Sequence, residues 1–436
     1  MKWFFLTLIS KLLTIFTQRK LHLISFKDLK LNKPLLRAIA EQGYENPTLV
    51  QVNAIPSILE KKDIITSAQT GTGKTAAFAL PILQLLHTYK DAPKKSKKIK
   101  AVVLSPTREL AIQIGSNFSN YGKYINLRIG VFYGGVSIEP QKDVLKKGLD
   151  ILIATPGRLL DLHKQDLINL DYIEIFVVDE ADLMLDMGFI NDVKKIERLC
   201  SKSKQVLMFS ATIPKKVEEL VSNILEDPIR IEVTPSITIP ENVNQWLYYV
   251  SKRHKMELCL HLLRNTIKGS LIIFRRTKFG VEKLEQTLLK NGYLVTSIHG
   301  NKTQKNRQNA LANFKMNKVN ILIATDVAAR GIDIENLESV INFDLPNIPE
   351  TYVHRIGRTA RAGKKGRAFS LCSIDEKSYI KKIERLINFD LDVVSDHPYP
   401  LDVTEKINFN KSKIQKSKHK KGRKSKASKK NKKRWY

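Results

Sequence analysis

Two groups of residues in the first half of the chain have the types and spacing needed for nucleotide chemistry. The first is a glycine-rich loop made of Ala68, Gln69, Thr70, Gly71, Thr72, Gly73, Lys74 and Thr75. It fits the phosphate-loop pattern with alanine in place of the first glycine. Backbone N–H groups of such a loop surround phosphate oxygens, and the following helix adds its positive dipole end. We expect Lys74 to bind the β- and γ-phosphates and the Thr75 hydroxyl to bind Mg²⁺.

The second group is a run of acids, Asp179, Glu180 and Asp182, which follows the apolar residues 175–178. An apolar strand that ends in acids places carboxylates at the carboxyl edge of a parallel sheet, where ligands bind in open α/β folds. We expect Asp179 to hold Mg²⁺ through water and Glu180 to orient and deprotonate the attacking water. The alternative is an acidic helix start, which favours Asp and Glu without any function.

Alternating apolar runs and amphipathic stretches indicate the elements that position these residues. Short Val/Ile/Leu runs separated by helical patterns are typical of buried parallel strands with crossover helices. One such set fills residues 25–230 and a second fills 245–390, with a proline-containing linker predicted at 231–244. The sequence Ile-Leu-Ile-Ala-Thr occurs at 151–155 and again at 321–325. This match favours two copies of a similar α/β unit.

The charge of the chain is concentrated at its ends. The 436 residues carry a formal net charge of +31, yet 14 Lys/Arg lie in residues 411–434, and four lie in residues 1–25 without any acid. The last 26 residues cannot form a core, so we predict a disordered basic tail within 391–436, either solubilising or an RNA tether. Residues 1–24 are apolar and basic. This composition is compatible with a targeting sequence, an interfacial anchor or an extension without folding consequence. Three separated cysteines exclude a disulfide framework and a cysteine-based zinc site.

The acids at 179–182 spell Asp-Glu-Ala-Asp, and with the motifs around them the chain resembles the DEAD-box RNA helicases. Phe26 and Gln51 are similar to that family's adenine-recognising Q motif, in which Gln51 would read the adenine edge and Phe26 would pack on the ring. The resemblance implies two tandem RecA-like domains. It also implies that Ser210, Thr212, Asp182 and His354 couple hydrolysis to unwinding.

The same resemblance assigns further residues to RNA and to the nucleotide. The expected RNA-binding residues are Pro106, Thr107, Arg108, Gly134, Gly135, Thr155, Gly157, Arg158, Gln304, Arg307 and Thr325. Arg358 and Arg361 would be arginine fingers that reach the γ-phosphate from the second domain, and Asp333 would contact the ribose. Hydroxyls, backbone N–H groups and arginines suit phosphate and sugar, so the expected grip on RNA is independent of base sequence.

The resemblance implies an ATP- and Mg²⁺-dependent enzyme that closes on RNA and unwinds or remodels short duplexes. The stretch 245–249, the residues around Arg358 and the Lys-rich tail resemble the ribosome-assembly branch, of the SrmB and RhlE kind. That branch implies a large-subunit ribosomal RNA precursor as substrate and ribosomal proteins as candidate partners. Remodelling in RNA degradation or cold shock, and an ATP-gated RNA clamp without productive unwinding, are the alternatives. We expect a cytoplasmic monomer without stable membrane association.

Overall fold

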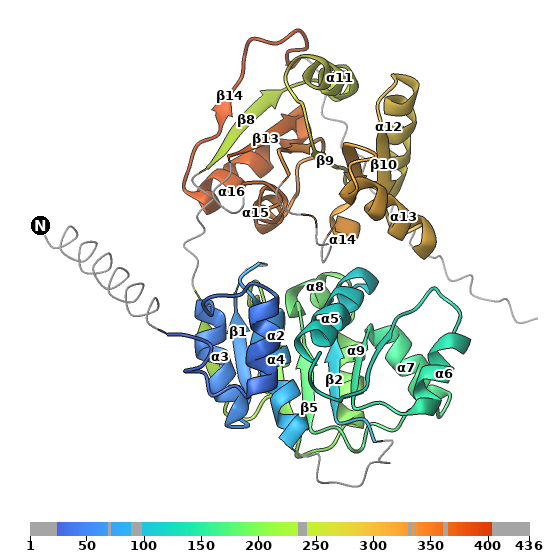
Figure 1. The fold of residues 1–436 in the computed structure, drawn as a ribbon. Coiled ribbons are helices and arrows are strands. Elements are labelled where there is room, and N and C mark those ends of the chain that lie inside the picture. Colours follow the sequence, from blue (N-terminus) through green and yellow to red (C-terminus); the bar gives the residue numbers. More distant parts are fainter. Residues whose placement is uncertain are drawn as a thin grey trace, which may run out of the picture.

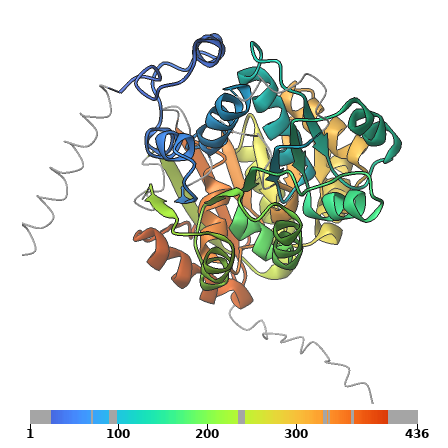
Figure 2. The ribbon, with the colours of Figure 1, turned by 90° about the horizontal axis from the view of Figure 1, so that it is seen from below.

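The computed structural model describes residues 24–68, 71–88, 98–233, 242–329, 334, 337–360 and 365–402. In this part of the chain, two parallel sheets flanked by helices lie one above the other (Figure 1). From below, the blue-to-green first half overlaps the yellow-to-red second half (Figure 2). The two tandem RecA-like domains predicted from the sequence are confirmed. The expectations for Gln69, Thr70, Asp333, Arg361, residues 1–23 and the tail from 403 lie outside the described residues.

The first half forms a seven-stranded sheet in the order β3-β4-β2-β5-β6-β1-β7. Its elements are α2 (Lys33–Glu41), α3 (Leu49–Leu59), β1 (Ile64–Ser67), α4 (Lys74–Thr88), β2 (Ala101–Leu104), α5 (Arg108–Tyr121), β3 (Ile129–Phe132), α6 (Glu139–Lys147), β4 (Ile151–Ala154), α7 (Pro156–Lys164), β5 (Ile175–Val178), α8 (Ala181–Asp186), α9 (Ile190–Leu199), β6 (Gln205–Ser210), α10 (Lys215–Ile224) and β7 (Ile229–Glu232).

The second half forms a seven-stranded sheet in the order β10-β11-β9-β12-β13-β8-β14. Its elements are β8 (Val243–Tyr249), η1 (Lys252–His254), α11 (Lys255–Asn265), β9 (Leu271–Phe274), α12 (Lys278–Lys290), β10 (Val295–Ile298), α13 (Gln304–Lys315), β11 (Ile321–Ala324), α14 (Asp326–Ala329), β12 (Ser339–Asn342), α15 (Pro349–Ile356), β13 (Gly366–Cys372), η2 (Ile374–Glu376), α16 (Lys377–Ile387) and β14 (Asp392–Val393).

The two sheets have the same order of strands when each half is numbered from its own beginning. The repeated Ile-Leu-Ile-Ala segments form β4 and β11, and both take the second position in their sheets. The repeated sequence therefore marks equivalent strands of two similar units.

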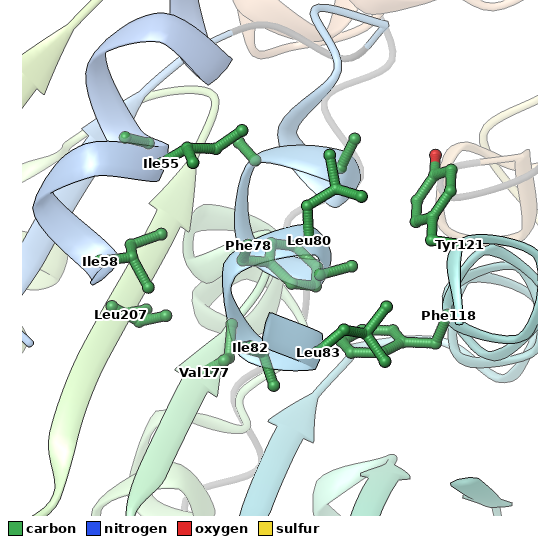
Figure 3. Packing of buried hydrophobic residues seen from close by; sticks show 14 of the residues in the cluster. Ile55, Ile58, Phe78, Leu80, Ile82, Leu83, Phe118, Tyr121, Val177 and Leu207 are labelled. Atoms are coloured by element: carbon green, nitrogen blue, oxygen red, sulfur yellow. The ribbon is translucent and has the colours of Figure 1, made fainter. Parts of the chain in front are cut away.

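The strands β2, β4 and β5 of the first sheet are buried at every position, and all of their residues are apolar. One face packs against α3, α4 and α5, where Phe78 lies with its ring centroid 5.1 Å from that of Phe209 and 6.1 Å from that of Phe118 (Figure 3). The opposite face packs against α7, α9 and α10. Continuous Val/Ile/Leu strands need this double cover, which fixes their carboxyl ends as one rigid edge.

Two boundaries differ from those predicted. β7 pairs with β1 up to Glu232, and β8 begins at Val243, so both sheets extend into the range predicted as linker. β14 pairs with β8 inside the predicted extension that starts at 391. The edge strands β7 and β14 are short and have no continuous apolar run, so their pairing depends on the neighbouring strand rather than on their own sequence.

Candidate functional site

A cavity of about 370 Å³ lies at the carboxyl edge of the first sheet. The strands that end there are β1, β5 and β6, which are neighbours in the sheet. The cavity brings together most of the residues expected to bind or cleave a nucleotide, and its lining includes Phe26, Gln51, Gly71, Gly73, Lys74, Thr75, Asp179, Glu180 and Arg358. Arg358 comes from the second half, so the site is built by both domains.

Lys74 and Glu180 form a buried ion pair at the centre of this cavity. Lys74 is 6 % exposed, and its Nζ lies 2.8 Å from Oε1 of Glu180. Burial opposes the charge on Lys74, but Glu180 and Asp179 outweigh it and hold the pKa of the lysine above its ordinary value. The ammonium is therefore charged, as the predicted binding of phosphate requires.

Asp179 has a shifted pKa, and Glu180 has a strained backbone conformation. Burial, together with the adjacent Glu180 carboxylate, raises the pKa of Asp179 to about 7. Glu180 has a φ of 52°, a left-handed conformation that side chains other than glycine adopt at a cost. It begins α8 without a side-chain capping bond, so its carboxylate remains directed to Lys74 rather than to the helix. Strained backbone at such a position is typical of functional residues.

Gln51 joins the predicted adenine site to the phosphate loop. Its Oε1 accepts from the Thr48 N–H at 3.0 Å, closing a capping box at the start of α3, and its Nε2 donates to the Gly73 carbonyl at 3.2 Å. Gly73 has a φ of 86°, and a Cβ there would collide with the Gln51 amide. Each end of the amide retains one further hydrogen-bonding position, which is available for a base edge.

The predicted coupling residues of the first half are directly bonded to one another. The Thr212 N–H and hydroxyl both donate to Oδ2 of Asp182 at 3.0 Å, and the Asp182 N–H donates to Ser210 Oγ at 3.1 Å. This ties the end of β6 to the start of α8, one residue from Glu180. The fourth predicted member, His354, lies across the domain boundary and lines a second cavity together with Asp182 and Thr212.

The expected RNA-binding residues of the first half lie at a different corner of the same edge. They follow β2, β3 and β4, which are neighbours at one end of the sheet. Thr107 caps α5 by accepting from the Leu110 N–H, and Gly135, with a φ of 74°, packs so closely on Arg108 that a Cβ would collide with the guanidinium. Pro106, Gly134 and Thr155 lie in the same turns between strand and helix, and Gly157 lies in the first turn of α7.

Arg158 differs from this pattern because it is bonded inside its own domain. It is 9 % exposed, and its guanidinium donates to Gln141 Oε1 at 2.8 Å and to the Val136 carbonyl at 3.0 Å. It therefore braces the loop that follows β3 and Gly135.

Gln304 and Arg307 bridge the two domains. Arg307 Nη2 lies 2.9 Å from Glu109 Oε2, and Gln304 Nε2 donates to Glu109 Oε1 at 3.1 Å. Gln304 also accepts from Arg108 at 3.4 Å. Glu109 was not among the predicted site residues, although its place directly after Arg108 was a signal that could have indicated it.

A second missed residue is Arg355, which anchors the helix that carries His354 and leads to Arg358. Its guanidinium binds both Asp326 carboxylate oxygens, at 2.6 and 2.8 Å, and the Asp344 carbonyl at 2.7 Å. Thr325, which follows β11, accepts from the first turn of α14 that contains Asp326. The start of α14, which follows Thr325, and the helix α15, which precedes Arg358, are therefore fixed to each other.

Comparison with known proteins identifies the family. Residues 48–220 match the DEAD/DEAH box helicase model, and residues 254–363 match the helicase conserved C-terminal domain. The chain is 40% identical to the DEAD-box ATP-dependent RNA helicase RhpA of Helicobacter pylori over 372 residues, which are 85% of this chain and 74% of that protein. The chain belongs to the DEAD-box ATP-dependent RNA helicases.

Other members of the DEAD-box family agree in sequence and in structure. The helicase CshA of Bacillus cereus is 41% identical over 84% of this chain and 69% of its own length. Saccharomyces cerevisiae Dbp5 bound to RNA and ADP BeF3 superposes with a TM-score of 0.75 at 29% identity, covering 85% of this chain and 95% of that one. The DEAD-box helicase Mss116 bound to ssRNA and UDP-BeF superposes with a TM-score of 0.77 at 28% identity, covering 86% of this chain and 81% of that one. This chain is accordingly an ATP-hydrolysing RNA helicase of two RecA-like domains.

Proposed function

We propose that Glu180 activates water for ATP hydrolysis and that Arg358 stabilises the charge that develops on the transferred phosphoryl group. The observation that carries this assignment is that the two residues, one from each domain, line the same cavity as the phosphate loop. Hydrolysis then requires both domains in place, which makes it dependent on closure of the cleft. The expected second finger, Arg361, would add to the same charge stabilisation.

The residues around the phosphate loop fit a nucleotide with Mg²⁺. Lys74 supplies a buried cation, α4 begins at the loop, and Thr75 and Asp179 offer oxygen atoms to a divalent cation. Bound Mg²⁺ would neutralise phosphate charge. Among the described residues no group of three or more His, Cys, Asp or Glu could hold a metal alone, which fits a cation shared with substrate phosphates.

We further propose that RNA binds along the corner formed by the strands β3, β4 and β2 and the equivalent strands β10, β11 and β9. The groups there are hydroxyls, turn N–H groups and Arg108, which suit phosphate and sugar and give no base readout. The contact of Glu109 with Arg307 crosses the same corner, so closure and RNA binding would favour each other. ATP and RNA together would close the domains and bend the strand, and hydrolysis would reopen them.

The test of this assignment is Glu180→Gln, which removes the base but keeps the shape of the site. We expect ATP binding to persist and RNA-stimulated turnover to fall by at least about 10²-fold. Glu219→Gln, at an exposed position of α10, is the matched control and should turn over normally. Normal turnover in Glu180→Gln would contradict the assignment.

A strand-displacement assay on a short tailed duplex separates unwinding from clamping. ATP-dependent displacement would support unwinding, whereas ATP-dependent binding without displacement would favour the clamp. ATPase stimulation by DNA equal to that by RNA would contradict the proposed preference for RNA.

We propose that the substrate is structured RNA, and the first candidate is a large-subunit ribosomal RNA precursor. The protein would bind it as a monomer, with ribosomal proteins as partners. Its support is the local resemblance of residues 245–249 and the Lys-rich end of the chain to that branch. Remodelling in RNA degradation or cold shock is the second candidate, and the similarity to CshA helicases favours it. Crosslinking the protein to cellular RNA and sequencing the attached RNA distinguishes the two. Within the described residues, no helix is long and apolar enough to cross a membrane.

A further inference from the structure

A second cavity, of about 440 Å³, lies beside the nucleotide cavity between the two domains. Glu180 and Arg358 line both cavities. The phosphate loop and the residues of the Q motif line only the first. The second cavity is lined instead by Asp182 and Thr212 from the first domain and by His354 and Ile348 from the second. The two residues proposed to act on the γ-phosphate therefore stand between two separate spaces.

Hydrolysis of ATP needs free space on two opposite sides of the γ-phosphorus. The attacking water and the leaving ADP lie roughly in line on opposite sides of the transferred phosphorus. ADP belongs to the first cavity, because Phe26, Gln51 and the phosphate loop are there. The water must then approach from the side of the second cavity. After the bond to ADP breaks, the phosphate has moved towards that same side.

We propose that the second cavity is the route by which water enters and inorganic phosphate leaves, separate from the route of ADP. The inference rests on the hydrolysis proposed above. In that step the water oxygen bonds to the γ-phosphorus, the bond from this phosphorus to the β–γ bridging oxygen breaks, and the water proton passes to the Glu180 carboxylate. The products are ADP in the first cavity and inorganic phosphate at the inner end of the second.

The distribution of charge along this route favours departure. Arg358 lies at the end shared with the nucleotide cavity, because it lines both cavities, whereas the carboxylates of Asp186 and Glu350 line the second cavity alone. Asp186 is exposed, which places it at the mouth. An anion that has left the arginine therefore meets negative side chains, and their field opposes its return.

Apolar residues from both domains also line the second cavity. Ile213 and Pro214 follow the coupling residue Thr212, and Ile348 directly precedes α15 of the second domain, where it is 43 % exposed. Since the two sides belong to different domains, separation of the domains would widen the mouth. Phosphate release would then be coupled to the same movement that lets go of RNA.

The experiment compares cleavage with phosphate release in Ile348→Trp at saturating RNA. Quench-flow measures ATP cleavage, a fluorescent phosphate-binding protein measures release, and ¹⁸O exchange between water and phosphate reports how long the product stays in the site. We expect cleavage to change little, phosphate release to slow by about tenfold, and exchange to rise. ADP release, followed with a fluorescent analogue, should keep its rate.

Two further variants make the result specific. Leu289→Trp, on α12 at a side chain that is 54 % exposed, adds the same bulk away from the cavity and should match the unchanged protein. Leu185→Trp narrows the same cavity from the first domain and should reproduce the effect of Ile348→Trp. Unchanged phosphate release and exchange in both cavity variants would overturn the route. Absence of ATP cleavage in the unchanged protein would instead overturn the proposed hydrolysis.

Discussion

The buried pair of Lys255 and Glu376 should be the most sensitive point in the second domain. Each residue is 3 % exposed, and the Lys255 Nζ lies 2.5 Å from Oε2 of Glu376 and 2.8 Å from the Phe343 carbonyl. Glu376 also accepts from Arg276, from the Leu345 N–H and from Ser373. Glu376→Gln would leave the buried ammonium of Lys255 without the carboxylate that it contacts, and Lys255→Met would leave the buried carboxylate with Arg276 as its remaining cation.

The expected cost follows from that burial. Removing one partner of a buried ion pair costs about 3–5 kcal/mol when the remaining charge is uncompensated. Arg276 beside Glu376 and Asp344 near Lys255 compensate in part, so we expect a loss of about 3 kcal/mol. This is a large share of the roughly 5–15 kcal/mol that stabilises a whole domain. The double variant Lys255→Met with Glu376→Gln leaves no buried charge, and the glutamine oxygen can still accept from the Leu345 N–H. We therefore expect the double variant to recover most of the loss, with a coupling energy of about 2–3 kcal/mol.

Urea unfolding of the four proteins measures this cycle. Trp246 reports on the second domain, because its ring stacks on Phe369 with centroids 5.0 Å apart, so its fluorescence follows the loss of that packing. Calorimetry on the same samples checks that the second domain melts as one unit. Single variants that each lose less than about 1 kcal/mol, or a double variant that loses the sum of both, would refute the reasoning.

Three other outcomes follow from the charges described above. Burial works against the Asp344 carboxylate, but Arg275 and Lys255 outweigh it and hold its pKa below 3.8. The stability that this carboxylate adds is thus present above pH 3.8 and lost as the pH falls below that value. Asp344→Asn should therefore lower the free energy of unfolding at neutral pH. Urea unfolding in which the difference between the variant and the unchanged protein does not shrink below pH 3.8 would contradict this. Glu109→Gln should raise the RNA concentration for half-maximal ATPase about tenfold, because it loses a charge-assisted contact between domains, while the exposed Glu139→Gln should not. Deleting residues 411–436 should weaken RNA affinity and flatten its salt dependence at unchanged saturating turnover; lost turnover would mean that the tail takes part in the mechanism.

The nucleotide cavity could be anticipated because its residues form contiguous motifs at the ends of buried strands. Strands covered on both faces are apolar throughout, so they stand out from the sequence. The residues after them must then lie at the carboxyl edge. Lys74 and Glu180 are 106 residues apart, yet each directly follows a feature that the sequence reveals, and the sheet brings them to 2.8 Å.

The bonds that connect domains or fill a domain's interior could not be anticipated in the same way. Glu109 and Arg307 are 198 residues apart, and Lys255 and Glu376 are 121 apart. A charged side chain on a helix has the same local pattern whether it faces solvent, RNA or a buried partner. Arg158 shows the consequence, because its motif predicts an RNA contact and its surroundings give it protein acceptors.

The equivalence of the two sheets explains why the domains contribute differently to one reaction. β1 and β8 take the same position in their sheets, and a lysine begins the first α-helix after each, Lys74 in α4 and Lys255 in α11. After β1 the chain turns through a glycine-rich loop, whereas residues 250–254 after β8 contain no glycine. Without that loop there is no cradle of N–H groups, and the lysine is neutralised by a carboxylate of its own domain. We therefore expect the first domain to exchange its internal ion pair for a nucleotide and the second domain to keep its own pair.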